Sequence, residues 1–332
     1  MTIVVIGLGS MGRRRIRLIH KIKPDSILIG VDGKEDRQIE AERACEQMGF
    51  TLSVYSSVSE IPDSSSIDAA IVSTSPLSHG AIISECLRNG WHVFTEINLV
   101  ADGYDENIKL AKDHGLTLYL SSTPMFRREI SYITETVHEF HGRVNYCFHV
   151  GQYLPDWHPW EDYKNFFAGQ KTTNGCREIM AIELPWMIRC FGEIDHVECI
   201  NNRQTNLNID YQDCYNILVK HDSGNTGVFV VDVVCRPPVR SLEVYGDGVY
   251  VSWDGRPDGV RCYDKKVGAM IPVDLYGEIE QQEGYNSMII ENAYEAELLD
   301  FLGVIRGEKE QKYGFDQDRK LLKLIDHIEG LD

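Results

Sequence analysis

The chain has 332 residues, enough for about two domains, and its 43% hydrophobic and 25% charged residues are ordinary for a globular protein. This composition excludes a disordered chain, a collagen-like repeat and a small disulfide scaffold. The net charge of −18 disfavours nucleic acid and anionic membranes as partners. Nine scattered cysteines without a CxxC pair predict reduced thiols and no metal cluster. Without a signal-like or membrane-spanning segment, we expect a cytoplasmic protein.

The first 122 residues alternate short apolar strands with helical stretches. The expected strands cover residues 3–6, 26–31, 51–54, 67–73, 91–95 and 116–121. The expected helices lie between them and end near residues 22, 48, 61, 89 and 114. This rhythm is typical of βαβ units with a parallel sheet. We therefore predict an α/β fold with a Rossmann dinucleotide-binding domain at residues 1–122.

The pattern changes after Ser122. A helix is expected at 128–140, followed by strands at 144–153, 215–220, 227–234, 242–245 and 249–253. A long insertion rich in aromatic, charged and Gly residues occupies 155–194, and two helices at 288–306 and 316–329 close the chain. We predict an α+β domain at 123–332 with a largely antiparallel open sheet. The last helices could alternatively pack back on the first domain.

A Gly7-x-Gly9-x-x-Gly12 turn stands between the first strand and the first helix. Such a turn brings backbone N–H groups and a helix N-terminus to a pyrophosphate. Asp32 ends the second strand, 20 residues after Gly12, where an acid binds the adenosine ribose hydroxyls. Asp32 favours NAD because it repels a 2′-phosphate. Lys34 and Arg37 keep NADP open as an alternative.

Two further features of this domain are ambiguous. Arg13, Arg14 and Arg15 begin the first helix, where one could reach a phosphate, or all could be solvated. The segment from Thr74 to His79 follows the fourth strand, at the sheet edge that faces a ligand. Its hydroxyls and backbone could line the cofactor, or His79 could simply be satisfied by a neighbour.

With these residues in place, the whole chain resembles the Gfo/Idh/MocA oxidoreductases, named for glucose–fructose oxidoreductase and inositol dehydrogenase. The resemblance is carried by the glycine turn, by the Thr-Ser-Pro-x-x-His loop, by the segment from Gly90 to Glu96 and by the order of the two domains. It implies a substrate cleft between the domains and hydride transfer on a sugar or polyol. The expected cofactor-binding residues are Gly7, Gly9, Ser10, Met11, Gly12, Asp32, Thr74, Ser75, His79 and Glu96.

The chain departs from the family where proton transfer is concerned. The usual Glu-Lys-Pro triplet reads Glu96-Ile97-Asn98, so the family's Lys is Ile97. Aligned without a gap from Phe191, the family's Asp and His positions hold Glu178 and Ile182. Because isoleucine can neither donate nor accept a proton, the usual Lys–His arrangement cannot be transferred to this chain.

A replacement is expected in the segment 151–163, which is rich in acids and Trp. Two prolines restrict its backbone, Trp faces suit sugar rings, and acids accept sugar hydroxyls. His158 is the first expectation for the catalytic proton acceptor, because it titrates near neutral pH, and Tyr163 is the second. The alternative is a loop whose Trp residues plug a domain junction. The residues expected to bind substrate are Asp156, Trp157, Glu161, Arg177, Glu178 and Arg236.

The sequence therefore predicts an NAD(P)-dependent oxidoreductase acting on a sugar, nucleotide sugar or polyol. The alternatives are a non-catalytic relative that binds dinucleotide and ligand, and an enzyme that uses bound NAD transiently for elimination or glycoside cleavage. We expect a small-molecule carbohydrate-type substrate and no metal. An open antiparallel sheet has a face to cover, so we also expect a homodimer or homotetramer formed through the second domain.

Overall fold

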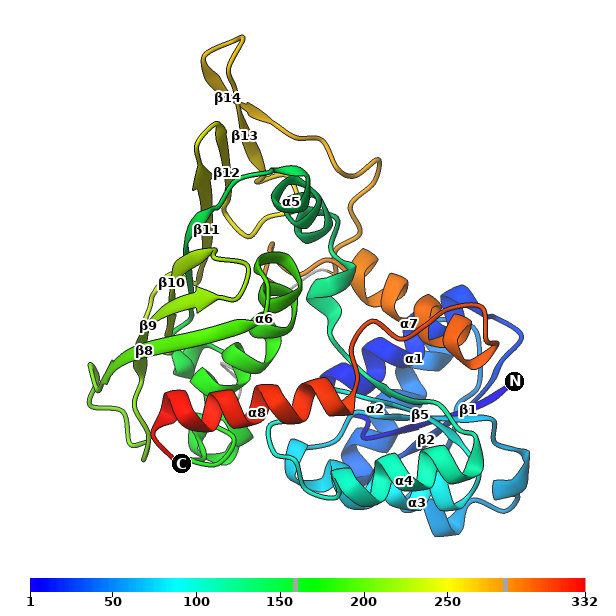
Figure 1. Cartoon of the computed structure of the whole chain (residues 1–332). Coiled ribbons are helices and arrows are strands. Elements are labelled where there is room, and N and C mark those ends of the chain that lie inside the picture. The colour runs from blue at the N-terminus through cyan, green and yellow to red at the C-terminus, as the bar shows by residue number, and fades with distance from the viewer. Residues whose placement is uncertain (158–160, 283–285, 332) are drawn as a thin grey trace. The chain divides into compact units, whose positions relative to one another are not determined.

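The computed structural model describes residues 1–157, 161–282 and 286–331 (Figure 1). Its residues form two compact units. The first contains Met1–Ser122 and Tyr294–Arg319, and the second contains Thr123–Ala293 and Lys320–Asp332. The division passes inside the last two helices, α7 (Glu291–Ile305) and α8 (Phe315–Glu329). Each unit is described by itself.

The first unit is built on a parallel sheet with the strand order β3-β2-β1-β4-β5-β6. This is the Rossmann order, whose ligand crevice lies at the carboxyl ends of the central strands. The strands are β1 (Thr2–Ile6), β2 (Ile27–Val31), β3 (Ser53–Tyr55), β4 (Ala69–Val72), β5 (His92–Thr95) and β6 (Leu118–Leu120). The helices are α1 (Ser10–Ile22), α2 (Glu35–Gln47), α3 (His79–Arg88) and α4 (Tyr104–His114).

The central strands of this sheet are buried on both faces. Residues 3–6 of β1 and all of β4 lie in the core, as their continuous apolar runs predict for a parallel sheet covered by helices. On one face α3 and α4 pack side by side (Figure 1). The predicted Rossmann fold is confirmed.

The second unit contains an eight-stranded sheet with the order β14-β13-β12-β11-β7-β10-β9-β8. All neighbours are antiparallel except β7 and β10, which run parallel. The strands are β7 (Asn145–Gly151), β8 (Ile194–Asn202), β9 (Cys214–His221), β10 (Thr226–Asp232), β11 (Val239–Gly246), β12 (Val249–Trp253), β13 (Arg261–Asp264) and β14 (Ala269–Pro272). The largely antiparallel sheet predicted for this domain is confirmed.

Two helices of this unit, α5 (Arg128–Glu139) and α6 (Gly175–Phe191), pack together, and α6 also contacts strands β9 and β10 (Figure 1). Residues alternate along β9 between buried and exposed positions, so one face of the sheet forms the core. The other face carries exposed apolar side chains, including Ile200 and Leu218. Strands β13 and β14 extend away from the rest of the sheet (Figure 1).

Two of these elements differ from the sequence expectation. Helix α6 lies within the segment expected to be an insertion, and it is buried almost all round despite Pro185 inside it. A helix that is apolar on all sides lacks the one-sided periodicity by which helices are recognised in sequence. Strand β8 and the β13–β14 hairpin were also not expected. Among the described residues, none of the helices has the length and apolar character needed to cross a membrane.

Candidate functional site

The glycine turn of the first unit is shaped by two close backbone approaches. A Cβ atom at Gly12 would lie 1.8 Å from the carbonyl oxygen of Gly7. Gly7 itself has a φ of 93°, a left-handed conformation, and a Cβ there would lie 2.6 Å from the Ser73 carbonyl oxygen. Gly9 is different, because its nearest neighbour would be Arg37 Nη1 at 3.9 Å. Gly7 and Gly12 therefore fold the turn, and Gly9 leaves space above it.

That space lies at the N-terminus of α1. Gly9 is the N-cap residue, and among the described side chains none caps the helix with a hydrogen bond. The first helical turn contains no acidic residue, and Ser10 is exposed while Met11 is half-buried. An uncapped helix end attracts anions through its N–H groups and its dipole. A glycine-lined space in front of such an end fits a dinucleotide pyrophosphate.

Asp32 stands at the carboxyl end of β2 with its carboxylate held in place. Its Oδ2 accepts a hydrogen bond from Leu8 N at 2.8 Å, and its Oδ1 accepts one from Lys34 N at 3.0 Å. Arg37 Nη1 lies 3.6 Å from Oδ2. The carboxylate is thus next to the glycine turn and oriented by the backbone, as ribose binding requires.

The loop after β4 is held together by its own side chains. The Ser78 hydroxyl lies 2.8 Å from Thr74 Oγ1 and donates to the Ser75 carbonyl at 2.7 Å. His79 is buried, with Nδ1 2.8 Å from Asn98 Oδ1 and Nε2 3.0 Å from the Thr74 carbonyl oxygen. Burial lowers the pKa of His79, which favours the neutral ring. Both ring nitrogens contact the protein, which agrees with a histidine satisfied by its neighbours.

Glu96 follows β5 and is bound by Arg15. Arg15 Nε lies 2.7 Å from Glu96 Oε1, and Nη2 lies 3.0 Å from Oε2. The same Nη2 lies 2.9 Å from Glu297 Oε2, and the guanidinium packs 4.5 Å from the centre of the Phe94 ring. Arg15 and Glu297 are fully buried, and Arg14 is also buried. The alternative that these arginines are solvated is therefore wrong for Arg14 and Arg15, whereas Arg13 is 28% exposed and pairs with Glu40.

In the second unit, the segment after β7 contacts the segment after β10 through Asp156 and Arg236. Arg236 donates from Nε to Asp156 Oδ2 at 2.6 Å, and its guanidinium lies 4.2 Å from the centre of the Tyr153 ring. Trp157 is partly exposed, and its indole N–H donates to the Gln152 carbonyl at 2.8 Å. Asp156 and Arg236 thus form one forked ion pair.

Other expected site residues of this unit are used differently or lie apart. Arg177 is buried in the first turn of α6, with Nη2 2.7 Å from Asp326 and Nη1 paired with Glu329. These ion pairs tie α6 to the end of α8. Tyr163 Oη accepts a hydrogen bond from Asn208 N at 3.1 Å, and Glu161 is exposed. His158 lies outside the described residues.

Glu178 has a different environment from every residue above. Its side chain is partly exposed, but Oε2 is buried and has no hydrogen-bond partner among the described residues. Burial raises the pKa of this carboxyl group to about 8. Ile182 lies four residues later on α6, on the same face of the helix, and is partly exposed as well. A carboxylate in this state can exchange a proton near neutral pH.

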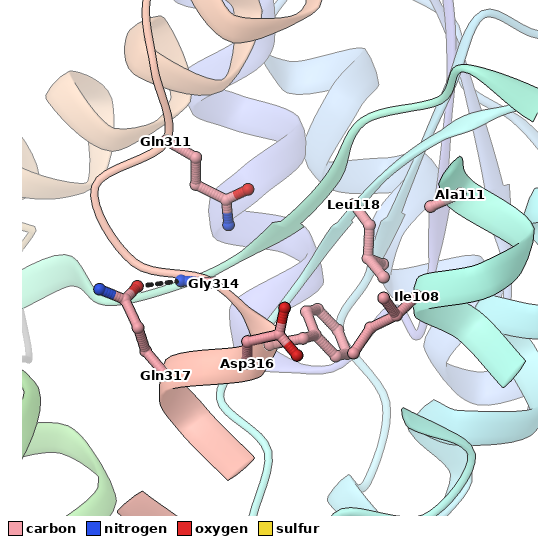
Figure 2. Close-up of a pocket in the computed structure, with 8 residues that line it drawn as sticks. Ile108, Ala111, Leu118, Gln311, Gly314, Asp316 and Gln317 are labelled. Carbon is pink, nitrogen blue, oxygen red and sulfur yellow. Dashed lines mark hydrogen bonds between the residues drawn. The ribbon is translucent and has the colours of Figure 1, made fainter. Parts of the chain in front are cut away.

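The first unit also contains a separate cavity of about 360 Å³, lined by α4, by Leu118 of β6 and by residues 311–317, which include the first turn of α8. Figure 2 shows apolar side chains of Ile108 and Leu118 on one side and polar groups from 311–317 on the other. Gln317 accepts a hydrogen bond from Gly314 N at 2.9 Å. None of the lining residues belongs to the expected site. Among the described residues, no group of three or more His, Cys, Asp or Glu side chains is arranged to hold a metal ion.

Comparison with known proteins adds to this geometry. Residues 1–122 match the family model GFO_IDH_MocA, described as "Oxidoreductase family, NAD-binding Rossmann fold". This domain belongs to the Gfo/Idh/MocA oxidoreductase family. The predicted family resemblance and the NAD-binding Rossmann domain are thereby confirmed.

Solved structures share the fold over the whole chain. UDP-N-acetylglucosamine 3-dehydrogenase GnnA from Acidithiobacillus ferrooxidans is 17% identical with a TM-score of 0.74, covering 100% of this chain and 97% of its own. Levoglucosan dehydrogenase in complex with NADH and levoglucosan is 14% identical, with a TM-score of 0.80 and coverage of 100% and 96%. A myo-inositol dehydrogenase from Corynebacterium glutamicum is 18% identical, with a TM-score of 0.76 and coverage of 100% and 96%. At these identities the likeness establishes the fold alone. A search of curated protein sequences finds no match.

Proposed function

We propose that this chain is an NAD(P)-dependent oxidoreductase that transfers a hydride between the nicotinamide ring and a carbinol carbon of a sugar, nucleotide sugar or polyol. The observation that carries the proposal is the uncapped glycine turn beside the fixed carboxylate of Asp32. The substrate class is supported by the names of the structural relatives, which are dehydrogenases of a nucleotide sugar, an anhydrosugar and a polyol. The fit of the glycine cradle to a pyrophosphate supports the cofactor.

The first unit would hold the cofactor through its backbone. The N–H groups at the start of α1 would bind the pyrophosphate above Gly9, and Asp32 would accept the hydroxyls of the adenosine ribose. Bound nicotinamide supplies the hydride acceptor or donor. Thr74, Ser75 and Glu96 follow strands β4 and β5, at the end of the sheet where this fold binds its ligands.

Oxidation of a hydroxyl also requires a group that takes its proton. Ile97 and Ile182 cannot do so. Among the described residues, we propose Glu178 as this group. Its carboxylate has a free buried oxygen, and its raised pKa of about 8 makes it a stronger base than an ordinary glutamate. His158 and Tyr163, the expectations from sequence, remain the competing assignments.

Substrate contacts would come from the segment after β7. The Trp157 ring offers an apolar face to a sugar ring, while Asp156 and Glu161 offer acceptors to its hydroxyls. Arg236 would hold an anionic substituent if the substrate has one. Arg177 is a weaker proposal, because its guanidinium is already paired with Asp326 and Glu329.

The aliphatic residues at 97 and 182 also favour a second candidate function. A protein that binds dinucleotide and ligand without turnover has no need of the family's Lys and His. Transient use of bound NAD, for elimination or glycoside cleavage, is a third possibility consistent with the same cofactor site. Stoichiometric release of NADH from NAD and substrate separates hydride transfer from both.

The decisive experiment measures NADH formation by the purified full chain with sugars, nucleotide sugars and polyols. Glu178→Gln should lower turnover by about 10² to 10⁴ while leaving NAD affinity unchanged. Glu139→Gln, which removes an exposed carboxylate from α5 of the same unit, is the matched control and should keep full activity. If Glu178→Gln is active and His158→Ala or Tyr163→Phe is not, the proton acceptor is one of those residues. If the chain binds NAD but forms no NADH with any of these substrates, hydride transfer on this substrate class is wrong.

We also propose that the chain forms a homodimer or homotetramer through the second unit. The outer face of its sheet exposes Ile200 and Leu218, which are 73% and 53% accessible, beside Cys147 on the central strand β7. Exposed apolar side chains gathered on one face mark an interaction surface. Light scattering at micromolar concentration should show a multimer, and Leu218→Glu should lower its mass. A wild-type monomer would refute this assembly.

A further inference from the structure

Asp232, the last residue of β10, connects the two segments of the second unit that contribute to the proposed substrate site. Its Oδ1 accepts hydrogen bonds from Val234 N at 2.8 Å and from Cys235 N at 2.7 Å. Its carbonyl oxygen accepts one from Gln152 N, in the segment after β7, at 3.3 Å. The carboxylate therefore holds the turn that leads to Arg236, and the backbone of the same residue holds the start of the other segment.

Backbone hydrogen bonds join the same two segments further along. Tyr153 N donates to the Cys235 carbonyl oxygen at 2.8 Å, and Leu154 N donates to the Val233 carbonyl oxygen at 2.9 Å. The Arg236 guanidinium lies 4.2 Å from the centre of the Tyr153 ring. A shift of the turn would therefore displace Arg236 and Tyr153 together.

His149 on β7 holds the second oxygen of the Asp232 carboxylate. Its Nε2 lies 2.6 Å from Asp232 Oδ2, and the two side chains are 37% and 5% exposed. Gly151 stands beside Asp232 in the register of β7 and β10, and a Cβ atom at this glycine would clash with the carboxylate. The glycine thus leaves the space through which Asp232 reaches His149.

Asp232 stays charged in this arrangement. Burial raises the pKa of its carboxyl group, but the hydrogen bonds from His149 and from the two backbone N–H groups outweigh burial and hold the pKa below its usual value. Histidine is the residue type that changes its charge between about pH 5 and pH 8. The net charge of the pair therefore depends on His149.

The other side chains near His149 leave Asp232 as its charged partner. Those that stand opposite or beside it on the outer face of the sheet are Val230 on β10, Ser241 and Glu243 on β11, and Cys147 on β7 itself. Among the described residues, none of these four forms a hydrogen bond or ion pair with His149. Glu243 is exposed to water, which screens its charge. Protonation of His149 thus acts on Asp232 first.

We propose that His149 is a positioning residue of the substrate site, which acts by fixing the Asp232 carboxylate and, through it, the turn that carries Arg236. This inference rests on the proposed function. A protonated histidine donates a charge-assisted hydrogen bond, which is stronger than the bond from the neutral ring. The turn is therefore held more firmly at acidic than at basic pH, and KM for the substrate should rise with pH. The affinity for NAD, whose proposed site lies in the first unit, should not change.

The test measures KM, kcat and NAD affinity of the purified full chain at about pH 6 and about pH 8, for the wild type and two variants of His149. His149→Ala removes the donor and should raise KM by at least about fivefold, while kcat changes by less than about twofold. His149→Gln keeps an N–H donor that cannot titrate. Its KM should stay within about twofold of the wild-type value at the higher pH, and should lose the change of about twofold to fivefold that the wild type shows between the two pH values.

Two measurements that need no turnover separate positioning from other effects. Hydrogen exchange of residues 232–237 should be faster in His149→Ala than in the wild type. Light scattering should give the wild-type mass for each variant, a necessary check because His149 lies on the sheet face proposed for assembly. His141→Ala, which removes an exposed histidine from the turn before β7, is the matched control and should leave every one of these quantities unchanged.

Three results would overturn the inference. They are unchanged KM and hydrogen exchange in His149→Ala, a pH dependence of KM that persists in His149→Gln, or a rise in KM that appears only together with a loss of assembly. A chain that forms no NADH with any of these substrates removes the proposed function instead. Hydrogen exchange then still decides whether His149 fixes the turn.

Discussion

In the first unit, the fully buried Arg15 and Glu297 lie 2.9 Å apart, and Arg15 also binds Glu96 through two nitrogens. In the second unit, Glu178 buries a carboxylate oxygen that has no partner among the described residues. A buried ion pair is costly to break, whereas a buried carboxylate without a cation beside it is a standing cost to the fold. The Arg15 cluster therefore stabilises the fold. The Glu178 carboxyl group instead has a raised pKa, which suits it to proton transfer.

The largest effect on stability is expected from removing Arg15, the cation of the buried cluster in the first unit. Arg15→Met should lower the free energy of unfolding by about 3–5 kcal/mol, because the fully buried Glu297 and the partly exposed Glu96 would lose their counter-ion. Guanidinium unfolding followed by circular dichroism measures this loss. Combining Arg15→Met with Glu96→Gln and Glu297→Gln should recover most of it. A loss below about 1 kcal/mol for the single variant would show that the network is not a stabilising pair.

The glycine turn provides the next test, in which two neighbouring glycines should behave differently. Gly12→Ala should destabilise the chain by about 1–3 kcal/mol or more, because its Cβ would meet the Gly7 carbonyl oxygen at 1.8 Å. Gly9→Ala meets only Arg37, at 3.9 Å, and should leave thermal stability unchanged. It should nevertheless weaken NAD binding, since the methyl group fills the space left for the pyrophosphate. Equal effects on stability would contradict the division of roles between them.

The glycine turn and the Arg15 cluster also differ in how well the sequence predicts them. The turn from Gly7 to Gly12 and Asp32 are local features whose geometry follows from residue type and spacing. Their placement could be predicted because each depends on a few neighbouring residues. The partners of Arg15 could not, since Glu96 and Glu297 are 81 and 282 residues away in the chain.

In the second unit, the sequence located most strands but missed helix α6, whose periodicity is hidden by burial on all sides. It did place Glu178 among the substrate-binding residues through the family resemblance. What it could not provide was the environment of the carboxylate, because burial of Oε2 depends on packing by segments far apart in the chain. The pairing of Asp156 with Arg236 was equally hidden, although both residues were singled out.

The pH dependence of stability sharpens the comparison for Glu178. Its pKa is raised to about 8 in the folded chain from an ordinary value of 4.5, so the folded state binds the proton more tightly. The protonated Glu178 side chain therefore contributes fully to stability below pH 4.5. This contribution is lost as the pH rises toward about 8. Glu178→Gln, which stays neutral, should therefore be more stable than the wild type by about 1–3 kcal/mol at pH 9. The two proteins should have similar stability at pH 5, as calorimetry can determine, and a gain that does not depend on pH would contradict the assignment.

The smallest effect on stability is expected for the exposed pair of Arg236 and Asp156. These side chains are 60% and 40% exposed, so water screens their attraction, and Arg236→Gln should change the melting temperature by less than about 2 °C. The pair matters for binding instead, because an anionic substrate would have to displace Asp156 from the guanidinium. Asp156→Asn should then lower KM for anionic sugars and leave KM for neutral sugars unchanged or higher, since the asparagine still accepts a hydroxyl but no longer competes for Arg236. If KM rises equally for both substrate types, Arg236 orients Asp156 for sugar hydroxyls and does not itself receive the anion.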